Sequence, residues 1–379
     1  MKLNFSKEVF FILLSIFLFT SAIGIDLVTF PTLFTKNQFN PVQIGIIGAY
    51  EILGGILMSF FLTKIILRFG FFKSLSASIF LFAAIILITY FCHNFYLWLA
   101  LSFGIGLNWF IAVIPRQSWL NTIIDNQNRS IITGIYSATV SAGIAFGPII
   151  VKISGANSYS SFLIAALLMV LSFNVLLLIN RHEINNIQLE KISLLEFLKN
   201  NPRAVLARFF LDAQCYSLLI FSVVFGKKIG FTSENSGLLI TAFMMSGFFD
   251  IFVGFIMKKY SGYKLINIGF LGCLIIFSTL CLYHQSYIFL LTAYFLFGFP
   301  VACIYVAVIA ITNSDYPNQK LIAANSSLQA VGSIGSLFGG LVSGVLIYEF
   351  DAVGFPIAIS LFCLTYLVFL VIYEKKYQK

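Results

Sequence analysis

Residues 134–151 read GIYSATVSAGIAFGPIIV, a stretch of 18 residues that contains no charged side chain and places Gly143 and Gly147 one helical turn apart. An α-helix rises ~1.5 Å per residue, so ~20 apolar residues cross the ~30 Å hydrocarbon core of a bilayer. Small residues at this spacing allow a second helix to approach closely. The stretch therefore predicts a membrane-spanning helix that packs tightly against a neighbour.

The composition extends this interpretation to the whole chain. Of 379 residues, 60% are hydrophobic and only 10% are charged, whereas a soluble domain has about 25% charged residues. The basic residues, which give a net charge of +9, lie in short breaks and form no stripe for nucleic acid. The six cysteines lack the spacing of a metal site, so we expect neither a metal nor another cofactor. A polytopic membrane protein that is not an enzyme remains.

Twelve apolar runs are long enough to span a bilayer, which predicts an all-α membrane protein because closed helices satisfy their own backbone polar groups in lipid. The runs are 9–34, 42–63, 74–92, 95–115, 131–151, 159–180, 204–226, 236–257, 265–283, 287–311, 321–348 and 353–373. The first resembles a secretory signal ending near Ala22. It continues to Phe34, however, and we interpret it as an uncleaved span.

The basic residues also predict the orientation. Twelve spans place both termini on one side, which then holds 19 of the 23 lysines and arginines, while the other side keeps Lys36, Lys152, Lys227 and Lys228. By the positive-inside rule, both termini are cytoplasmic, and we expect the inner (plasma) membrane.

The chain repeats itself around its longest polar break. That break predicts a cytoplasmic linker at 181–203 between six-helix bundles at 1–180 and 204–379. At an offset of 192 residues, six glycines of the first half fall on glycines of the second: Gly45 on Gly237, Gly55 on Gly247, Gly70 on Gly262, Gly106 on Gly298, Gly143 on Gly335 and Gly147 on Gly339. Two halves repeated in the same orientation are typical of secondary transporters that rock around a site near the midplane.

The opening stretch also resembles a family motif. Gly134, Gly143, Gly147 and Pro148 match the antiporter motif of the major facilitator superfamily, G-x8-G-x3-G-P-x2-G, with Val151 in place of the last glycine. The resemblance covers essentially the whole chain and implies two six-helix bundles and, for this motif, efflux. Ordinary packing of small residues in a membrane helix is the alternative interpretation.

Two further signatures of that family are incomplete in this chain. The loop after the second span keeps Arg68, Gly70 and Lys73 but lacks the family's aspartate, which makes its electrostatic latch at the cytoplasmic gate doubtful. The fourth span has Ala100 where the family has an arginine linked to proton coupling. Arg116 lies further along, and we interpret it as an anchor at the membrane interface.

Four carboxylates inside the spans are candidates for proton coupling, because an ionisable group in lipid is costly. Asp26 is expected near the outer surface, ~26 Å from the inner face, either solvated or binding. Asp212 follows Arg208 by four residues and can pair with it. Asp250 lies toward Lys258 and Lys259, so an inner-gate ion pair and a transport role are both open.

Glu51 is the preferred candidate of the four. It is predicted ~15 Å below the outer surface, with no basic residue within a turn, and Gly54 and Gly55 let another helix come close. It could exchange a proton during transport, or it could form a neutral hydrogen bond to a neighbouring helix.

For the substrate, the family resemblance implies a cavity lined by spans 1, 4, 7 and 10. Besides Asp26 and Asp212, these spans offer Asn108, Trp109, Gln214, Tyr216 and Tyr305. Such aromatic and polar groups suit a modestly polar organic solute, although simple helix packing can also explain each aromatic.

We therefore expect a monomeric secondary transporter that exports a small organic molecule in exchange for protons. Uptake of a metabolite or a siderophore-type compound is one alternative. A non-transporting receptor with a transporter fold is another, because the loop aspartate and the span-4 arginine are missing.

Overall fold

The structure is a computed structural model that describes residues 7–123, 129–178, 197–199, 201–316 and 321–377. Its long helices agree with the predicted spans to within a few residues at most ends, and the described residues contain no strand. Eleven stretches are long and apolar enough to cross a membrane, and the last of them, Ala323–Lys375, contains two helices. Most of the predicted linker at 181–203 lies outside the described residues.

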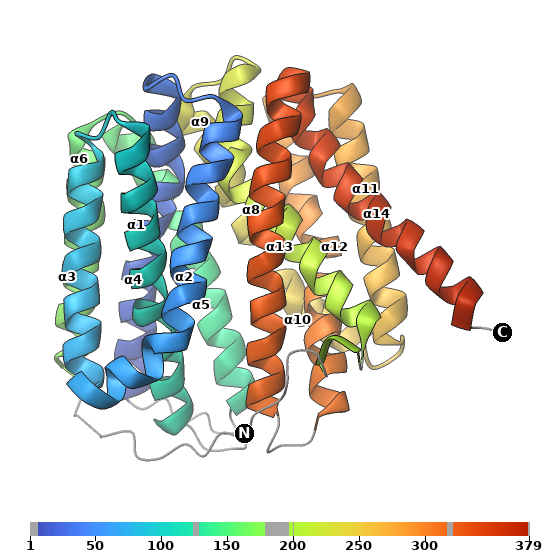
Figure 1. Cartoon of the computed structure of the whole chain (residues 1–379), viewed down its shortest axis with the longest axis horizontal. Coiled ribbons are helices and arrows are strands. Elements are labelled where there is room, and N and C mark those ends of the chain that lie inside the picture. The colour runs from blue at the N-terminus through green and yellow to red at the C-terminus, as the bar shows by residue number, and fades with distance from the viewer. Residues whose placement is uncertain (1–6, 124–128, 179–196, 200, 317–320, 378–379) are drawn as a thin grey trace. The chain divides into compact units, whose positions relative to one another are not determined.

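The helices of the first half are α1 (Lys7–Lys36), α2 (Pro41–Phe69), α3 (Phe71–Thr89), α4 (Phe95–Ile123), α5 (Arg129–Ser154) and α6 (Tyr159–Leu176). Those of the second half are α8 (Pro202–Lys228), α9 (Ser233–Met245), α10 (Phe249–Ile256), α11 (Gly262–Leu282), α12 (Tyr287–Asp315), α13 (Leu321–Phe350) and α14 (Gly354–Tyr377) (Figure 1). Two short 3₁₀ helices, Ser246–Phe248 and Asp351–Val353, follow α9 and α13.

The chain forms two compact units. Unit 1 contains Met1–Phe39, Tyr50–Asn186 and Thr232–Met245, and unit 2 contains Asn40–Ala49, Ile187–Phe231 and Ser246–Lys379. In unit 1, α1 packs against α4, α5 and α6, and α3 packs against α4 and α6. In unit 2, α8 packs against α12, α13 and α14, and α11 packs against α12 and α14 (Figure 1).

The internal repeat is visible in how glycines bring helices together. In unit 1, a Cβ on Gly143 would lie 2.7 Å from the carbonyl oxygen of Phe17, and in unit 2, a Cβ on Gly335 would overlap the carbonyl oxygen of Phe209. Gly335 lies 192 residues after Gly143, and Phe209 lies 192 residues after Phe17, so the two contacts are equivalent in the repeat. The same α1–α5 and α8–α13 packing is therefore built twice, because only glycine permits backbones this close.

Each unit also takes one segment from the opposite half of the sequence. Gly45, at the start of α2, packs against Gly340 in unit 2, whereas its repeat partner Gly237, in α9, packs against Val28 in unit 1. In unit 1, the Thr241 hydroxyl donates to the carbonyl oxygen of Ala145 at 2.8 Å. The two exchanged segments begin at repeat-equivalent positions, so the exchange follows the repeat.

The eighth predicted span is broken where it leaves unit 1. After α9 ends at Met245, one 3₁₀ turn at Ser246–Phe248 precedes α10, and the unit boundary falls at the same point. This turn packs directly against Gly298 of α12, since a Cβ on Gly298 would overlap the Ser246 side chain. A 3₁₀ turn inside a helix often marks a hinge.

Candidate functional site

Arg208 and Asp212 form an ion pair in the interior of α8. The Nη2 atom of Arg208 lies 2.8 Å from Oδ2 of Asp212, as the spacing of four residues predicts. The side chains are only 9% and 17% exposed. The other ion pairs among the described residues lie at the two ends of α8, where Arg203 contacts Glu374 and Lys228 contacts Asp351.

Two further helices complete the surroundings of this pair. Gln329 of α13 accepts a hydrogen bond from Nη2 of Arg208 at 3.2 Å, and the ring centroid of Tyr305 on α12 lies 5.4 Å from the guanidinium carbon. A Cβ on Gly332 of α13 would overlap Oδ2 of Asp212, so the carboxylate rests directly on that backbone. We call Arg208, Asp212, Tyr305, Gln329 and Gly332 the ion-pair cluster.

The other predicted cavity residues of unit 2 lie outside this cluster. Gln214 is completely buried, and its Oε1 accepts from the Cys363 thiol at 3.2 Å. The Tyr216 hydroxyl donates to the carbonyl oxygen of Gly48 at 3.0 Å, at the start of α2. Of the predicted cavity residues in unit 2, Asp212 and Tyr305 therefore lie beside the Arg208 guanidinium, whereas Gln214 and Tyr216 do not.

Asp250, at the start of α10, does not form the ion pair considered for it. Neither Lys258 nor Lys259 makes a salt bridge to it within the described part of the chain. It lies instead within electrostatic range of Tyr305 and Cys215. Asp250 therefore belongs to the electrostatic surroundings of the ion-pair cluster.

In unit 1, the expectation that Asp26 could be solvated near the outer surface is wrong. Asp26 is 5% exposed, and neither carboxylate oxygen has a hydrogen-bond partner among the described residues. The neighbouring α1–α5 contact explains this enclosure, because Gly24 and Gly147 bring the two backbones together. Distance along a helix could not give the packing around Asp26.

Glu51 lies on α2, half-buried, where α2 meets α4. A Cβ on Gly106 would overlap the Glu51 carbonyl oxygen, and a Cβ on Gly54 would overlap that of Phe103. The close approach of a second helix, expected from the glycines, is therefore present. The charges of Glu51 and Asp26 interact, which brings two of the predicted carboxylates into one electrostatic neighbourhood.

The predicted cavity residues of α4 make packing contacts. The Asn108 amide donates to the carbonyl oxygen of Gly104 at 2.7 Å and is 3% exposed. The Trp109 ring lies 5.8 Å from that of Phe19 on α1. In this structure, the Asn108 hydrogen bond lies within α4, and the Trp109 ring packs against α1.

Arg116 is not the interface anchor that its position suggested. It is completely buried, because α4 continues to Ile123 and carries it beneath α1 and α6. Its guanidinium donates to Ser15 at 3.3 Å, Ser172 at 2.9 Å and the Ala112 carbonyl oxygen, and it lies 4.7 Å from the Phe19 ring centroid. The only sequence signal was a charge one residue beyond the predicted end of the span.

The motif residues differ in their surroundings. Gly143 and Gly147 are buried against α1, and Pro148 is buried, whereas a Cβ on Gly134 would meet nothing within 4 Å. In the loop motif, Gly70 has φ +81°, which explains why glycine stands there. Arg68 and Lys73 are exposed beside it.

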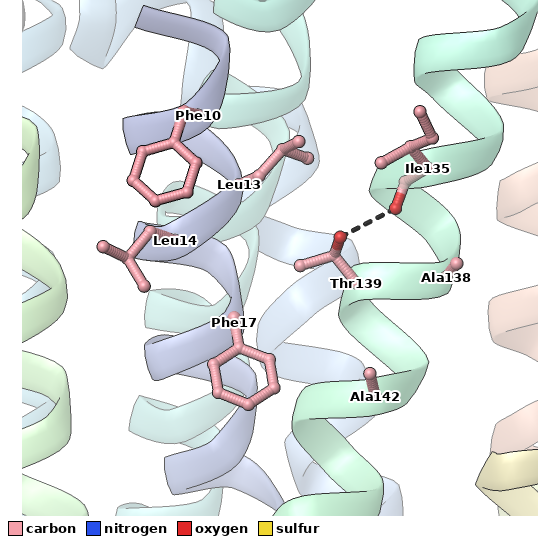
Figure 2. Close-up of a pocket in the computed structure, with 8 residues that line it drawn as sticks. All are labelled: Phe10, Leu13, Leu14, Phe17, Ile135, Ala138, Thr139 and Ala142. Carbon is pink, nitrogen blue, oxygen red and sulfur yellow. Dashed lines mark hydrogen bonds between the residues drawn. The ribbon is translucent and has the colours of Figure 1, made fainter. Parts of the chain in front are cut away.

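A groove of about 470 Å³ opens between α1 and α5 in unit 1. The residues that line it, drawn in Figure 2, are Phe10, Leu13, Leu14 and Phe17 of α1 and Ile135, Ala138, Thr139 and Ala142 of α5. The Thr139 hydroxyl donates to the carbonyl oxygen of Ile135 at 2.8 Å. The groove therefore offers apolar contact and little polar recognition.

No group of three or more His, Cys, Asp or Glu residues arranged to hold a metal occurs in the described part of the chain. Carboxylates inside the spans lie in the ion-pair cluster and in the Asp26–Glu51 neighbourhood. One combines a cation with a carboxylate, and the other places two carboxylates near each other.

Comparisons with known proteins agree with this architecture. A family model described as Major Facilitator Superfamily matches residues 10–278 and 204–379. The nucleoside transporter NupG superposes with a TM-score of 0.80 at 15% identity, covering 98% of this chain and 100% of that one. A bacterial homolog of the human lysosomal transporter Spinster gives 0.73 at 14% identity, with 98% and 96% covered.

A D-xylose-proton symporter has the same fold, with a TM-score of 0.72 at 13% identity and coverage of 94% and 96%. No curated protein sequence matches the chain. At these identities the structural likeness concerns the fold alone.

Proposed function

This chain belongs to the Major Facilitator Superfamily, and we propose that it exports a small organic solute by proton-coupled alternating access. The observation that carries the proposal is that ionisable groups are retained inside the spans of both units. The Arg208–Asp212 pair and the buried Asp26 are costly there, so a functional role is the default explanation.

Alternating access would be a rocking of two six-helix halves, residues 1–180 and 204–379, joined by the linker at 181–203. The 3₁₀ turn at Ser246–Phe248 supports this proposal because it provides a hinge where the chain passes between compact units. Efflux is proposed from the motif in α5, whose Gly143 and Gly147 form a close contact with α1. We propose a monomer in the inner (plasma) membrane.

Proton coupling is proposed to use Glu51, with Asp212 and then Asp26 as the next candidates. Glu51 is half-buried, and its backbone lies at the α2–α4 contact. A carboxylate that binds a proton in one conformation and releases it in another links the two gradients. The likeness to a proton symporter concerns the fold and leaves the direction of transport open.

Purified protein in liposomes tests the function directly. We expect an imposed pH gradient to drive movement of at least one solute from a panel that includes nucleosides, sugars and organic acids. Solute that moves opposite to the proton flow is exchanged for protons, which supports efflux. Solute that moves in the same direction as the protons supports the alternative of uptake. If no solute moves although ligands bind, the receptor alternative is correct.

Cysteine labelling tests the proposed orientation. In a cysteine-free background, a cysteine at Asn157, an exposed residue between α5 and α6, should react with an impermeant reagent added outside intact cells. A cysteine at Asn186 should react only after permeabilisation. Its side of the membrane holds most of the lysines and arginines, and the positive-inside rule therefore predicts that this side is cytoplasmic. The reverse pattern would show that the orientation is wrong.

A further inference from the structure

The ion-pair cluster is present in one repeat and absent from the other. At the offset of 192 residues, Arg208 and Asp212 correspond to Ile16 and Thr20. Both repeats nevertheless form the same helix contact at Gly143 and Gly335. Buried ion pairs often add no stability over apolar side chains of similar size. The equivalent contact of the first repeat forms with Ile16 and Thr20, so the packing at this position does not require an ion pair.

The guanidinium of Arg208 has unused hydrogen-bonding capacity. Its Nη2 atom serves both Asp212 and Gln329, while its Nε has no acceptor among the described residues and lies against Gly332, where a Cβ would come within 2.8 Å of it. Arginine has five N–H donors, and a carboxylate can bind two of them along one edge. The residue as a whole is 7% exposed, so this capacity is held in a site from which water is largely excluded.

Arg208 is also the cation of this cluster, and its surroundings are acidic or neutral. Asp212 pairs with it, the neutral ring of Tyr305 lies 5.4 Å from its guanidinium carbon, and Asp250 is a second acidic group near Tyr305. From α13, Gln329 and Gly332 contribute neutral groups. A carboxylate that bound to Arg208 would compete with the carboxylate of Asp212 for the guanidinium.

We propose that Arg208 binds the carboxylate of the transported solute, and that Asp212 occupies the guanidinium while the site is empty. This inference rests on the function proposed above and names its substrate class as small organic monocarboxylates. The Tyr305 ring beside the guanidinium provides an apolar surface for the hydrocarbon part of such an acid. Gly332 leaves room for Asp212 at the backbone of α13.

Calorimetric binding to the purified full-length protein at fixed pH and ionic strength tests the proposal. The probes are benzoate and pyruvate, with benzamide as the uncharged counterpart of benzoate. Wild type should bind at least one acid and should not bind benzamide measurably. Arg208→Lys keeps the charge but loses the planar fork, so binding should weaken about ten-fold.

Asp212→Asn separates this proposal from a merely structural role. Removing the competing carboxylate should tighten binding of the acid several-fold, whereas loss of a structural ion pair would weaken it. Arg203→Lys is the matched control, because Arg203 lies on the same helix and pairs with Glu374 at its end. It should bind the acid as wild type does.

Three results would overturn the proposal: binding of neither acid, equal binding of benzamide and benzoate, or no tightening in Asp212→Asn. If Arg208→Lys does not fold, the Asp212→Asn and benzamide results still decide. A wild-type protein that transports other solutes in liposomes but binds neither acid would leave the proposed function intact. In that case only the substrate class would be wrong.

Discussion

Replacing Glu51 with glutamine should abolish transport driven uphill by a pH gradient while substrate binding is retained. Glutamine imitates the protonated acid and cannot release a proton, so the linkage between the two gradients is lost. The substitution is close in size, and the α2–α4 contact at this position is made by the Glu51 backbone and Gly106. We therefore expect the variant to fold.

The measurement is solute flux into proteoliposomes with and without an imposed pH gradient. Glu51→Asp keeps an acid with a shorter reach and should retain partial coupling. Glu349→Gln is the matched control, because Glu349 is an exposed residue near the end of α13, and it should behave as wild type. Full gradient-driven transport by Glu51→Gln would show that Glu51 is not the proton-coupling residue, and Asp212 and then Asp26 would be the next candidates.

Replacing Gly143 with leucine should eliminate transport through an effect on helix packing. Any Cβ at this position overlaps the Thr20 hydroxyl and presses on the Phe17 carbonyl oxygen, so α1 and α5 must separate. Overpacking of this kind typically costs about 1–3 kcal/mol. A secondary transporter whose helices must pack closely in at least one conformation would then lose activity, while membrane insertion is largely retained.

Gly134→Leu provides a control within the same motif. A Cβ on Gly134 meets nothing within 4 Å, so this variant should transport nearly as wild type does. Flux and the amount of protein in the membrane should be measured together for both variants. Wild-type flux in Gly143→Leu would mean that the motif spacing is accidental.

The helices could be predicted from sequence because hydrocarbon thickness and backbone satisfaction constrain a membrane chain strongly. The glycine repeat was equally informative, since Gly143 and Gly335 form equivalent close contacts. The break at Ser246–Phe248 does not follow from the length and hydropathy of the span. Ser246 and Gly247 form a pair that often accompanies a helix kink, but hydropathy over 236–257 indicates a single continuous span.

The candidate site could be predicted only where it is local in sequence. Arg208 and Asp212 share a helix face, and their pairing follows from a spacing of four residues. Gln329 and Gly332 reach the same pair from α13, more than 100 residues away, and no local pattern marks them. The enclosure of Asp26 and Arg116 likewise depends on which faces of α1 and α4 are covered.

The segment Thr232–Met245 has a consequence for how the protein is made. It completes unit 1, yet the ribosome produces it after residues 187–231, which belong to unit 2. At about 5–20 residues per second, α5 waits for seconds before Thr241 can reach Ala145 and Glu234 can accept from the Ala156 amide. The first six helices therefore enter the membrane before unit 1 can reach its final packing. During biosynthesis, the two halves of the gene product mature together and not one after the other.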